Sequence, residues 1–275
     1  ARRAALWTGT TGRGLKLLTR EGRTETIPVA AGDERALAVD GVLAILESRS
    51  GEIWLGTYGG GVNILDPATR AVRQLPYGSE PGAVSAPFVT AIVEDTHGNF
   101  WLGTDGGGLN LARADGTVLK VFRNDPAKPS TLPANTVWAL AVDANGHVWV
   151  ATDGGGLARV VDPAAAPEAI EFQVLSRADG LSSDTLYGVV PDARGRLWLS
   201  GNAGLMRLDP ETRAVKTYHR EHGLQGEEFS FGAYFRLRDG RVAFGGPRGF
   251  NIFDPAALTE NSPPPPLAHT NVDVL

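Results

Sequence analysis

Short apolar runs alternate with glycine-containing turns along most of the chain. Each run is four to six residues long, is bounded by Gly, Asp or Pro, and shows no 3.6-residue helical period. Such runs are typical of β-strands in an antiparallel sheet. The clearest unit spans residues 42–75, with runs at 42–46, 53–57, 62–65 and 72–75. The pattern therefore predicts a unit of four short strands.

The same unit recurs at a nearly constant interval. The sequence Trp-Leu-Gly-Thr-Tyr-Gly-Gly-Gly at 54–61 has close copies at 101–108 and 149–156, and weaker copies at 7–14, 198–204 and 243–249. The last glycines of the copies lie at 14, 61, 108, 156, 204 and 249, which gives steps of 47, 47, 48, 48 and 45 residues. A period of this length, built from short strands, predicts an all-β fold: a β-propeller of four-stranded antiparallel blades, with six blades visible.

Two residue types keep a fixed place in the repeat. A small residue precedes each hairpin glycine by seven positions, and we expect it where the innermost strands converge on the central axis. These residues are Ala44, Ala91, Ala139, Gly188 and Ala233. The recurring tryptophans favour packing between blades over a carbohydrate platform. Trp138 is an exception, because it lies on a predicted innermost strand and has no counterpart in the other repeats.

The repeat phase also predicts the domain organisation. Residues 1–262 form the propeller, and its first blade lacks the innermost strand because the repeat begins inside a hairpin. A propeller ring must close to bury its blade faces, so we expect these six blades to belong to a seven-bladed ring, in preference to a closed ring of six. Residues 263–275 contain four consecutive prolines and are predicted to be a linker leading into a further β domain.

Composition and motifs exclude several functions. The net charge of −5 argues against a nucleic-acid partner, and the lack of cysteine excludes disulfides and thiolate metal sites. The sequence contains no Gly-x-Ser-x-Gly elbow and no phosphate-binding loop. His219 and His222 have spacing compatible with two metal ligands, but no third ligand is indicated. We therefore expect no catalytic residue, no metal and no cofactor in this segment.

Three motifs resemble a known family. The pattern at 94–109, in which Asp-x-x-Gly leads into Trp-Leu-Gly-Thr and three glycines, resembles the two-component-regulator propeller repeat, and 223–229 with 245–255 resemble its terminal copy. The resemblance implies the C-terminal blades of a periplasmic sensor region in an inner-membrane receptor, a hybrid histidine kinase or a sensor diguanylate cyclase. It further implies upstream blades, a downstream β domain, a homodimer through the parent receptor, and a cytoplasmic output domain that these residues do not include.

The ligand site is predicted from blade topology. The turns between second and third strands lie on the same face as the connections between blades at 76–88, 123–136, 176–185 and 219–230, and we refer to it as the connection face. These connections are not repeated in sequence, as is typical of binding surfaces. We expect a small molecule or an oligosaccharide to bind there, bordered by 223–229. The candidate residues are Tyr58, Asp105, Trp138, Asp153, Asn202 and Arg248. A lyase acting at the channel mouth and a structural protein-interaction ring remain the alternatives.

Overall fold

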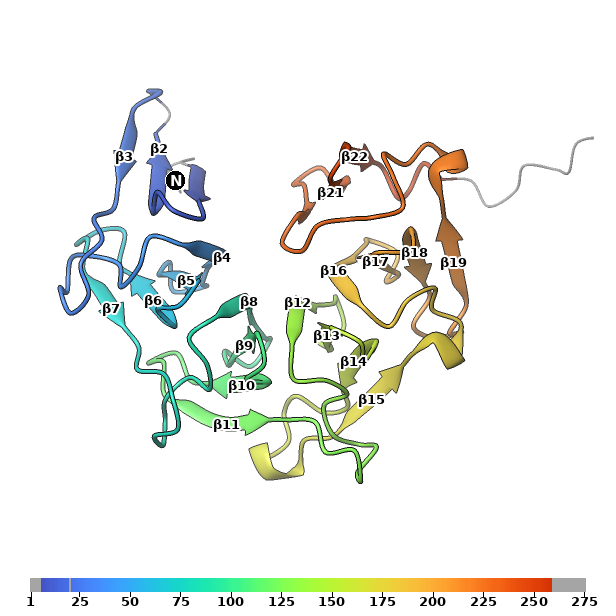
Figure 1. Ribbon diagram of the computed structural model, residues 1–275, viewed down its shortest axis with the longest axis horizontal. Coiled ribbons are helices and arrows are strands. Elements are labelled where there is room, and N and C mark those ends of the chain that lie inside the picture. Colours follow the sequence, from blue (N-terminus) through green and yellow to red (C-terminus); the bar gives the residue numbers. More distant parts are fainter. Residues whose placement is uncertain (1–5, 20, 259–275) are drawn as a thin grey trace, which may run out of the picture.

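The structure is a computed structural model that describes residues 6–19 and 21–258. It contains six antiparallel sheets that follow one another along an arc, with innermost strands β4, β8, β12 and β16 toward the centre (Figure 1). The all-β propeller prediction is confirmed. The predicted linker at 263–275 lies outside the described residues.

The blades are numbered here from 1 to 6 in chain order. Blade 1 has β1 (Leu6–Gly9), β2 (Leu15–Leu18) and β3 (Thr24–Thr26), and blade 2 has β4 (Val42–Glu47), β5 (Ile53–Thr57), β6 (Val62–Leu65) and β7 (Val72–Gln74). Blade 3 has β8 (Val89–Glu94), β9 (Phe100–Thr104), β10 (Leu109–Ala112) and β11 (Val118–Phe122). Blade 4 has β12 (Val137–Val142), β13 (Val148–Thr152), β14 (Leu157–Val160) and β15 (Phe172–Leu175). Blade 5 has β16 (Leu186–Pro191), β17 (Leu197–Gly201), β18 (Leu205–Leu208) and β19 (Val215–Tyr218), and blade 6 has β20 (Tyr234–Arg236), β21 (Val242–Gly246) and β22 (Gly249–Phe253).

In the part of the chain that the structure describes, the helices are three short 3-10 turns: η1 (Pro167–Ala169) between the last two strands of blade 4, and η2 (Arg177–Asp179) and η3 (Arg220–His222) in connections between blades. Within the described ranges, no helix is long and apolar enough to cross a membrane. The outer strand of blade 4 begins at Phe172, after η1 and the buried Ile170.

The small residues on the innermost strands have the predicted steric role. Ala139 is fully buried between neighbouring blades. At Gly188, a Cβ atom would lie only 2.8 Å from the ring of Tyr234 in blade 6. Tyr234 fills that space, and burial of its phenol raises the pKa of Tyr234 to about 12. Glycine therefore replaces alanine in blade 5 because an aromatic ring occupies the position of the methyl group.

The tryptophans pack between blades, as predicted. Trp54 and Trp101 are fully buried, and the Trp54 ring stacks on Phe100 of the next blade with centroids 3.9 Å apart. In blades 3 to 5 the indole is also fixed by a hydrogen bond that the sequence analysis did not anticipate. Trp101 Nε1 donates to Asp95 Oδ2 at 2.9 Å, and the same bond joins Trp149 to Asp143 and Trp198 to Asp192.

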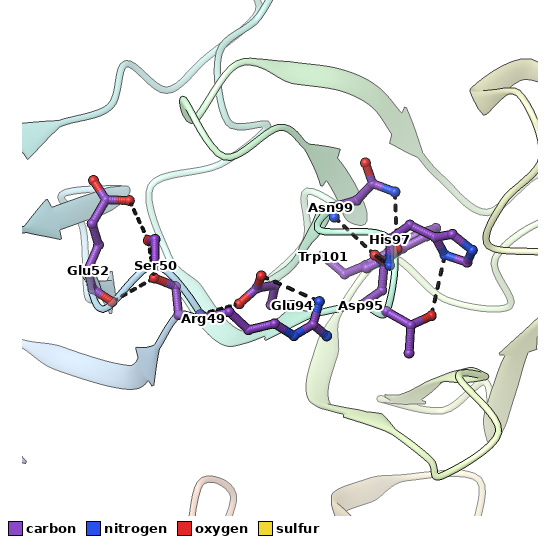
Figure 2. Close-up of polar contacts among 10 residues, drawn as sticks. Arg49, Ser50, Glu52, Glu94, Asp95, His97, Asn99 and Trp101 are labelled. Carbon is purple, nitrogen blue, oxygen red and sulfur yellow. Dashed lines mark hydrogen bonds and ion pairs between the residues drawn. The ribbon is translucent and has the colours of Figure 1, made fainter. Parts of the chain in front are cut away.

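The same aspartate closes its own hairpin. Figure 2 shows Asp95 of blade 3, whose carboxylate also accepts from the backbone N–H groups of His97 and Asn99 and from the Asn99 side chain. In blade 4 the residue at the place of Asn99 is His147, whose Nδ1 lies 3.0 Å from Asp143 Oδ2. His147 is therefore a half-buried partner of the hairpin aspartate.

Candidate functional site

Two candidate aspartates hold neighbouring blades together on the connection face. Asp105 of blade 3 accepts a hydrogen bond from Thr136 Oγ1 at 3.0 Å, and Asp153 of blade 4 accepts one from Thr185 Oγ1 at 2.9 Å. Each threonine directly precedes the innermost strand of the following blade. Both carboxylates remain exposed, so their free lone pairs stay available to a ligand.

Tyr58 occupies the same repeat position in blade 2 and makes the same kind of contact with different chemistry. Its ring meets the edge of Phe88, which precedes β8, with centroids 4.7 Å apart. The side chain is nevertheless 64% exposed. In blades 2 to 4 the position thus links successive blades, through an aromatic pair in blade 2 and a hydroxyl–carboxylate pair in blades 3 and 4.

The two remaining turn candidates lie near the end of the array. Asn202 of blade 5 accepts from Ser183 Oγ at 2.7 Å. Arg248 of blade 6 lines a pocket of about 280 Å³ together with the connection between blades 5 and 6. The pocket residues are Arg220, Gln225, Gly226, Glu227, Glu228, Pro247 and Arg248. This pocket brings Arg248 together with the predicted bordering segment 223–229.

The side-chain amide of Gln225 connects the two sides of the pocket through two hydrogen bonds. Gln225 Oε1 accepts from the backbone N–H of Arg248 at 3.0 Å, and Gln225 Nε2 donates to the carbonyl of Glu228 at 2.7 Å. Gly246 faces this amide at a distance that leaves no room for a Cβ atom. The amide therefore fixes the spacing between the connection and the turn that carries Arg248.

Glu227 fixes the first residues of the same connection through contacts with His219 and Arg220. Its carboxylate lies 2.8 Å from His219 Nδ1 and accepts from the backbone N–H of Arg220 at 3.0 Å. The hydrogen bond from His219, followed by that from Arg220, lowers the pKa of Glu227 below its ordinary value. Glu227 is therefore ionised at neutral pH and fixes the shape of the loop, whereas Arg220, Glu228 and Arg248 are the other charged residues that line the pocket.

Trp138 lies apart from this pocket, in a group of aromatic rings from three successive blades. Its ring centroid is 6.5 Å from that of Tyr187 on β16 and 5.1 Å from that of Phe231, just before β20. Trp138 was a candidate from the sequence, whereas Tyr187 and Phe231 were not. Aligning the innermost strands would have placed Tyr187 beside Trp138, because both directly precede the small residue of their repeat.

The candidates therefore do not form one cluster. Arg248 is in the pocket, Trp138 is in the aromatic group, and Tyr58, Asp105 and Asp153 link blades along the connection face.

Comparisons with known proteins agree with this architecture. The two-component regulator propeller model matches residues 84–106 and 131–154, which run from the connections into blades 3 and 4. Histidine kinase P4 of Formosa agariphila is 28% identical over 93 residues, which are 34% of this chain and 7% of that protein.

Two solved structures share the fold. The extracellular domain of the putative hybrid two-component system BT3049 from B. thetaiotaomicron matches with a TM-score of 0.60 and 22% identity, over 92% of this chain and 38% of that one. A catalytically inactive virginiamycin B lyase from Staphylococcus aureus matches with a TM-score of 0.66 and 14% identity, over 92% of this chain and 76% of that one. The chain spans well under half the length of the kinase and of the extracellular domain. It is a β-propeller in which residues 84–106 and 131–154 match the two-component regulator propeller repeat, and its fold is similar to that of the extracellular domain of a putative hybrid two-component system.

Proposed function

We propose that this chain is the ligand-sensing propeller segment of a membrane-bound bacterial receptor, located in the periplasm, and that it binds without catalysing a reaction. The observation that carries the proposal is the pocket between Arg248 and the connection 219–230, because its lining combines two arginines with Glu228. Signal output, through a kinase or a cyclase, belongs to another part of the receptor.

The pocket chemistry supports a small hydroxyl-rich ligand such as an oligosaccharide. Arg220 and Arg248 offer hydrogen-bond donors, and Glu228 offers acceptors, within a space of about 280 Å³. Hydroxyl groups both donate and accept, so a ligand that carries several of them can satisfy this mixed lining. The size suits one or two sugar residues more than a macromolecular partner.

The test is a binding comparison between matched arginine variants of blade 6. Oligosaccharides that raise the melting temperature are first identified by thermal-shift screening and then titrated by calorimetry. Arg248→Ala should weaken binding by at least about tenfold, because a hydrogen bond to a charged group contributes roughly 1.5–3 kcal/mol. Arg238→Ala, which removes the same charge from the 237–240 hairpin of blade 6, should bind normally.

Equal binding by both variants would refute the pocket assignment. Release of a shorter or unsaturated product, measured by mass spectrometry, would instead favour the lyase alternative. The pair formed by His219 and Glu227 beside the pocket is the feature that such a lyase would use.

We also infer that further blades and a downstream β domain of the same receptor cover the first and last sheets. Leu6 of blade 1 is 57% exposed, and Phe250 of blade 6 is 71% exposed. Apolar blade faces of this kind need a neighbour. The isolated chain should therefore self-associate in light scattering as its concentration rises. A monodisperse monomer that melts cooperatively would favour a closed ring of six blades.

A further inference from the structure

The innermost strands of blades 2 to 5 share a backbone irregularity. In each, one extra residue interrupts the pairing with the second strand: between Val42 and Ala44, Val89 and Ala91, Val137 and Ala139, and Leu186 and Gly188. Such bulges redirect a side chain and are frequent next to binding sites and at barrel rims. The extra residues are Leu43, Thr90, Trp138 and Tyr187.

The backbone repeats at these bulges, but the side chains do not. Leucine, threonine, tryptophan and tyrosine occupy one position, each directly before the small residue that packs at the axis. Thr90 uses its hydroxyl inside the fold, where Oγ1 contacts the carbonyl oxygens of Gly103 and Val137. A position whose backbone is constant and whose side chain varies is suited to selecting a ligand. The two aromatic residues at this position, Trp138 and Tyr187, lie together on blades 4 and 5.

Phe231 extends this aromatic surface into blade 6. It is 47% exposed and lies at a tilt of 33° against Trp138, while Trp138 and Tyr187 are half-buried. The three rings come from the same end of three successive blades, directly after the connections. They form a small apolar surface on the connection face, separate from the residues that line the Arg248 pocket.

One polar atom of this surface, the indole Nε1 of Trp138, lacks a hydrogen-bond partner among the described residues. This nitrogen is buried, whereas the indoles of Trp101, Trp149 and Trp198 each donate to a hairpin aspartate. An unsatisfied buried N–H group destabilises a protein by roughly 1–3 kcal/mol. The half-exposed Phe231 ring lies against this indole, with ring centroids 5.1 Å apart.

We propose that Trp138, Tyr187 and Phe231 form a second binding site, which takes the flat C–H face of a pyranose ring and donates Trp138 Nε1–H to one of its oxygens. Aromatic faces carry partial negative charge and attract the weakly positive C–H groups of such a ring. A single well-placed polar group in an apolar surface then fixes the orientation of the ligand. This site is independent of the Arg248 pocket, so either can fail without the other.

The test observes the indole directly. The chain contains 6 tryptophans, and ¹⁵N-tryptophan labelling gives each indole N–H its own NMR resonance. Trp138→Phe identifies the Trp138 resonance by its loss. Maltohexaose, cellohexaose and xylohexaose are then titrated separately, and at least one of them should shift the Trp138 resonance in a saturable way, both in the wild type and in Arg248→Ala.

Variants separate stacking from hydrogen bonding. Trp138→Phe keeps a ring and should weaken binding of the active hexaose about fivefold, the contribution of one net hydrogen bond. Trp138→Ala loses the platform and should weaken it more than about tenfold. Phe250→Ala, an exposed aromatic outside the group, should bind like the wild type. The proposal is wrong if none of the three sugars shifts the Trp138 resonance, or if Trp138→Ala binds normally while its other five indole resonances stay native.

Discussion

Equivalent positions of the repeat are buried in the inner blades and exposed in the outermost ones. The residue before the repeat tryptophan is Ile53 in blade 2, which is 1% exposed, and Leu6 in blade 1, which is 57% exposed. The first residue after the last turn glycine is Leu205 in blade 5, which is 1% exposed, and Phe250 in blade 6, which is 71% exposed. The same pattern of apolar residues therefore gives opposite environments, depending on whether a blade has neighbours on both faces.

The difference shows that a blade does not contain its own core. One buried cluster joins Trp101 and Phe122 of blade 3 to Val150 and Phe172 of blade 4. Each sheet thus supplies half of two cores, as expected for repeat proteins, whose stability depends on the interfaces between units.

The largest loss of stability should come from truncating Leu205, the buried member of the pair formed by Leu205 and Phe250. Leu205→Ala removes a side chain from a core shared by blades 5 and 6 and should reduce the free energy of unfolding by about 3 kcal/mol. Phe250→Ala should change it by less than about 0.5 kcal/mol, because its ring is mostly in water. Urea denaturation of both variants measures the difference, and equal losses would contradict the comparison.

Asp192→Ala should destabilise blade 5 almost as much. Its buried carboxylate accepts from Arg196 Nε at 3.0 Å and from Trp198 Nε1 at 3.1 Å, so both donors lose this acceptor. Removing one member of a buried ion pair typically lowers stability by about 3 kcal/mol. Asp209→Ala is the control, since that aspartate caps the backbone N–H groups of an outer turn and its loss should lower stability by about 1 kcal/mol or less.

The hairpin of blade 4 should make stability depend on pH. Burial disfavours the charged form of Asp143, yet hydrogen bonds from Trp149 and His147 hold its pKa below the ordinary value. Its contribution is therefore present above the pKa of the unfolded chain, near 3.8, and is lost as the pH falls through the folded pKa. Asp143→Asn should lower stability at pH 7 and flatten its fall between about pH 5 and pH 2. An unchanged slope in acid-unfolding curves would rule this out.

The smallest effect is a gain of stability in blade 2. Ser48 stands where blades 3 to 5 have aspartate, and Trp54 Nε1 is buried without a partner. Glu52 occupies the place of the donor Asn99, so the pair Ser48→Asp and Glu52→Asn transfers the blade 3 arrangement without bringing two carboxylates together. We expect about 1 kcal/mol of added stability in the double variant and none in Ser50→Asp. A double variant less stable than the wild type would show that another feature of blade 2 excludes the aspartate.

The hairpins also show which features of the fold could be predicted from the sequence. The repeat of Asp, Gly and Trp at fixed spacing was sufficient to place the strands, because turn chemistry acts over a few residues within one blade. The bond from Asp to the indole joins residues only six positions apart, yet turn chemistry alone does not predict it. In blade 6, Leu237 and Ala243 replace both partners together, a sequence signal that the pair forms one unit.

The sequence by itself determined the blade count, the strand positions, the small residues at the axis and the buried tryptophans, since each follows from a local pattern repeated every 45 to 48 residues. Only the tertiary structure decided which unrepeated side chains meet. Thr136 bonds to Asp105 across 31 positions, and Phe231 reaches Trp138 from two blades away. Those contacts depend on how one sheet is placed against the next, and a repeat pattern carries no information about side chains that occur once.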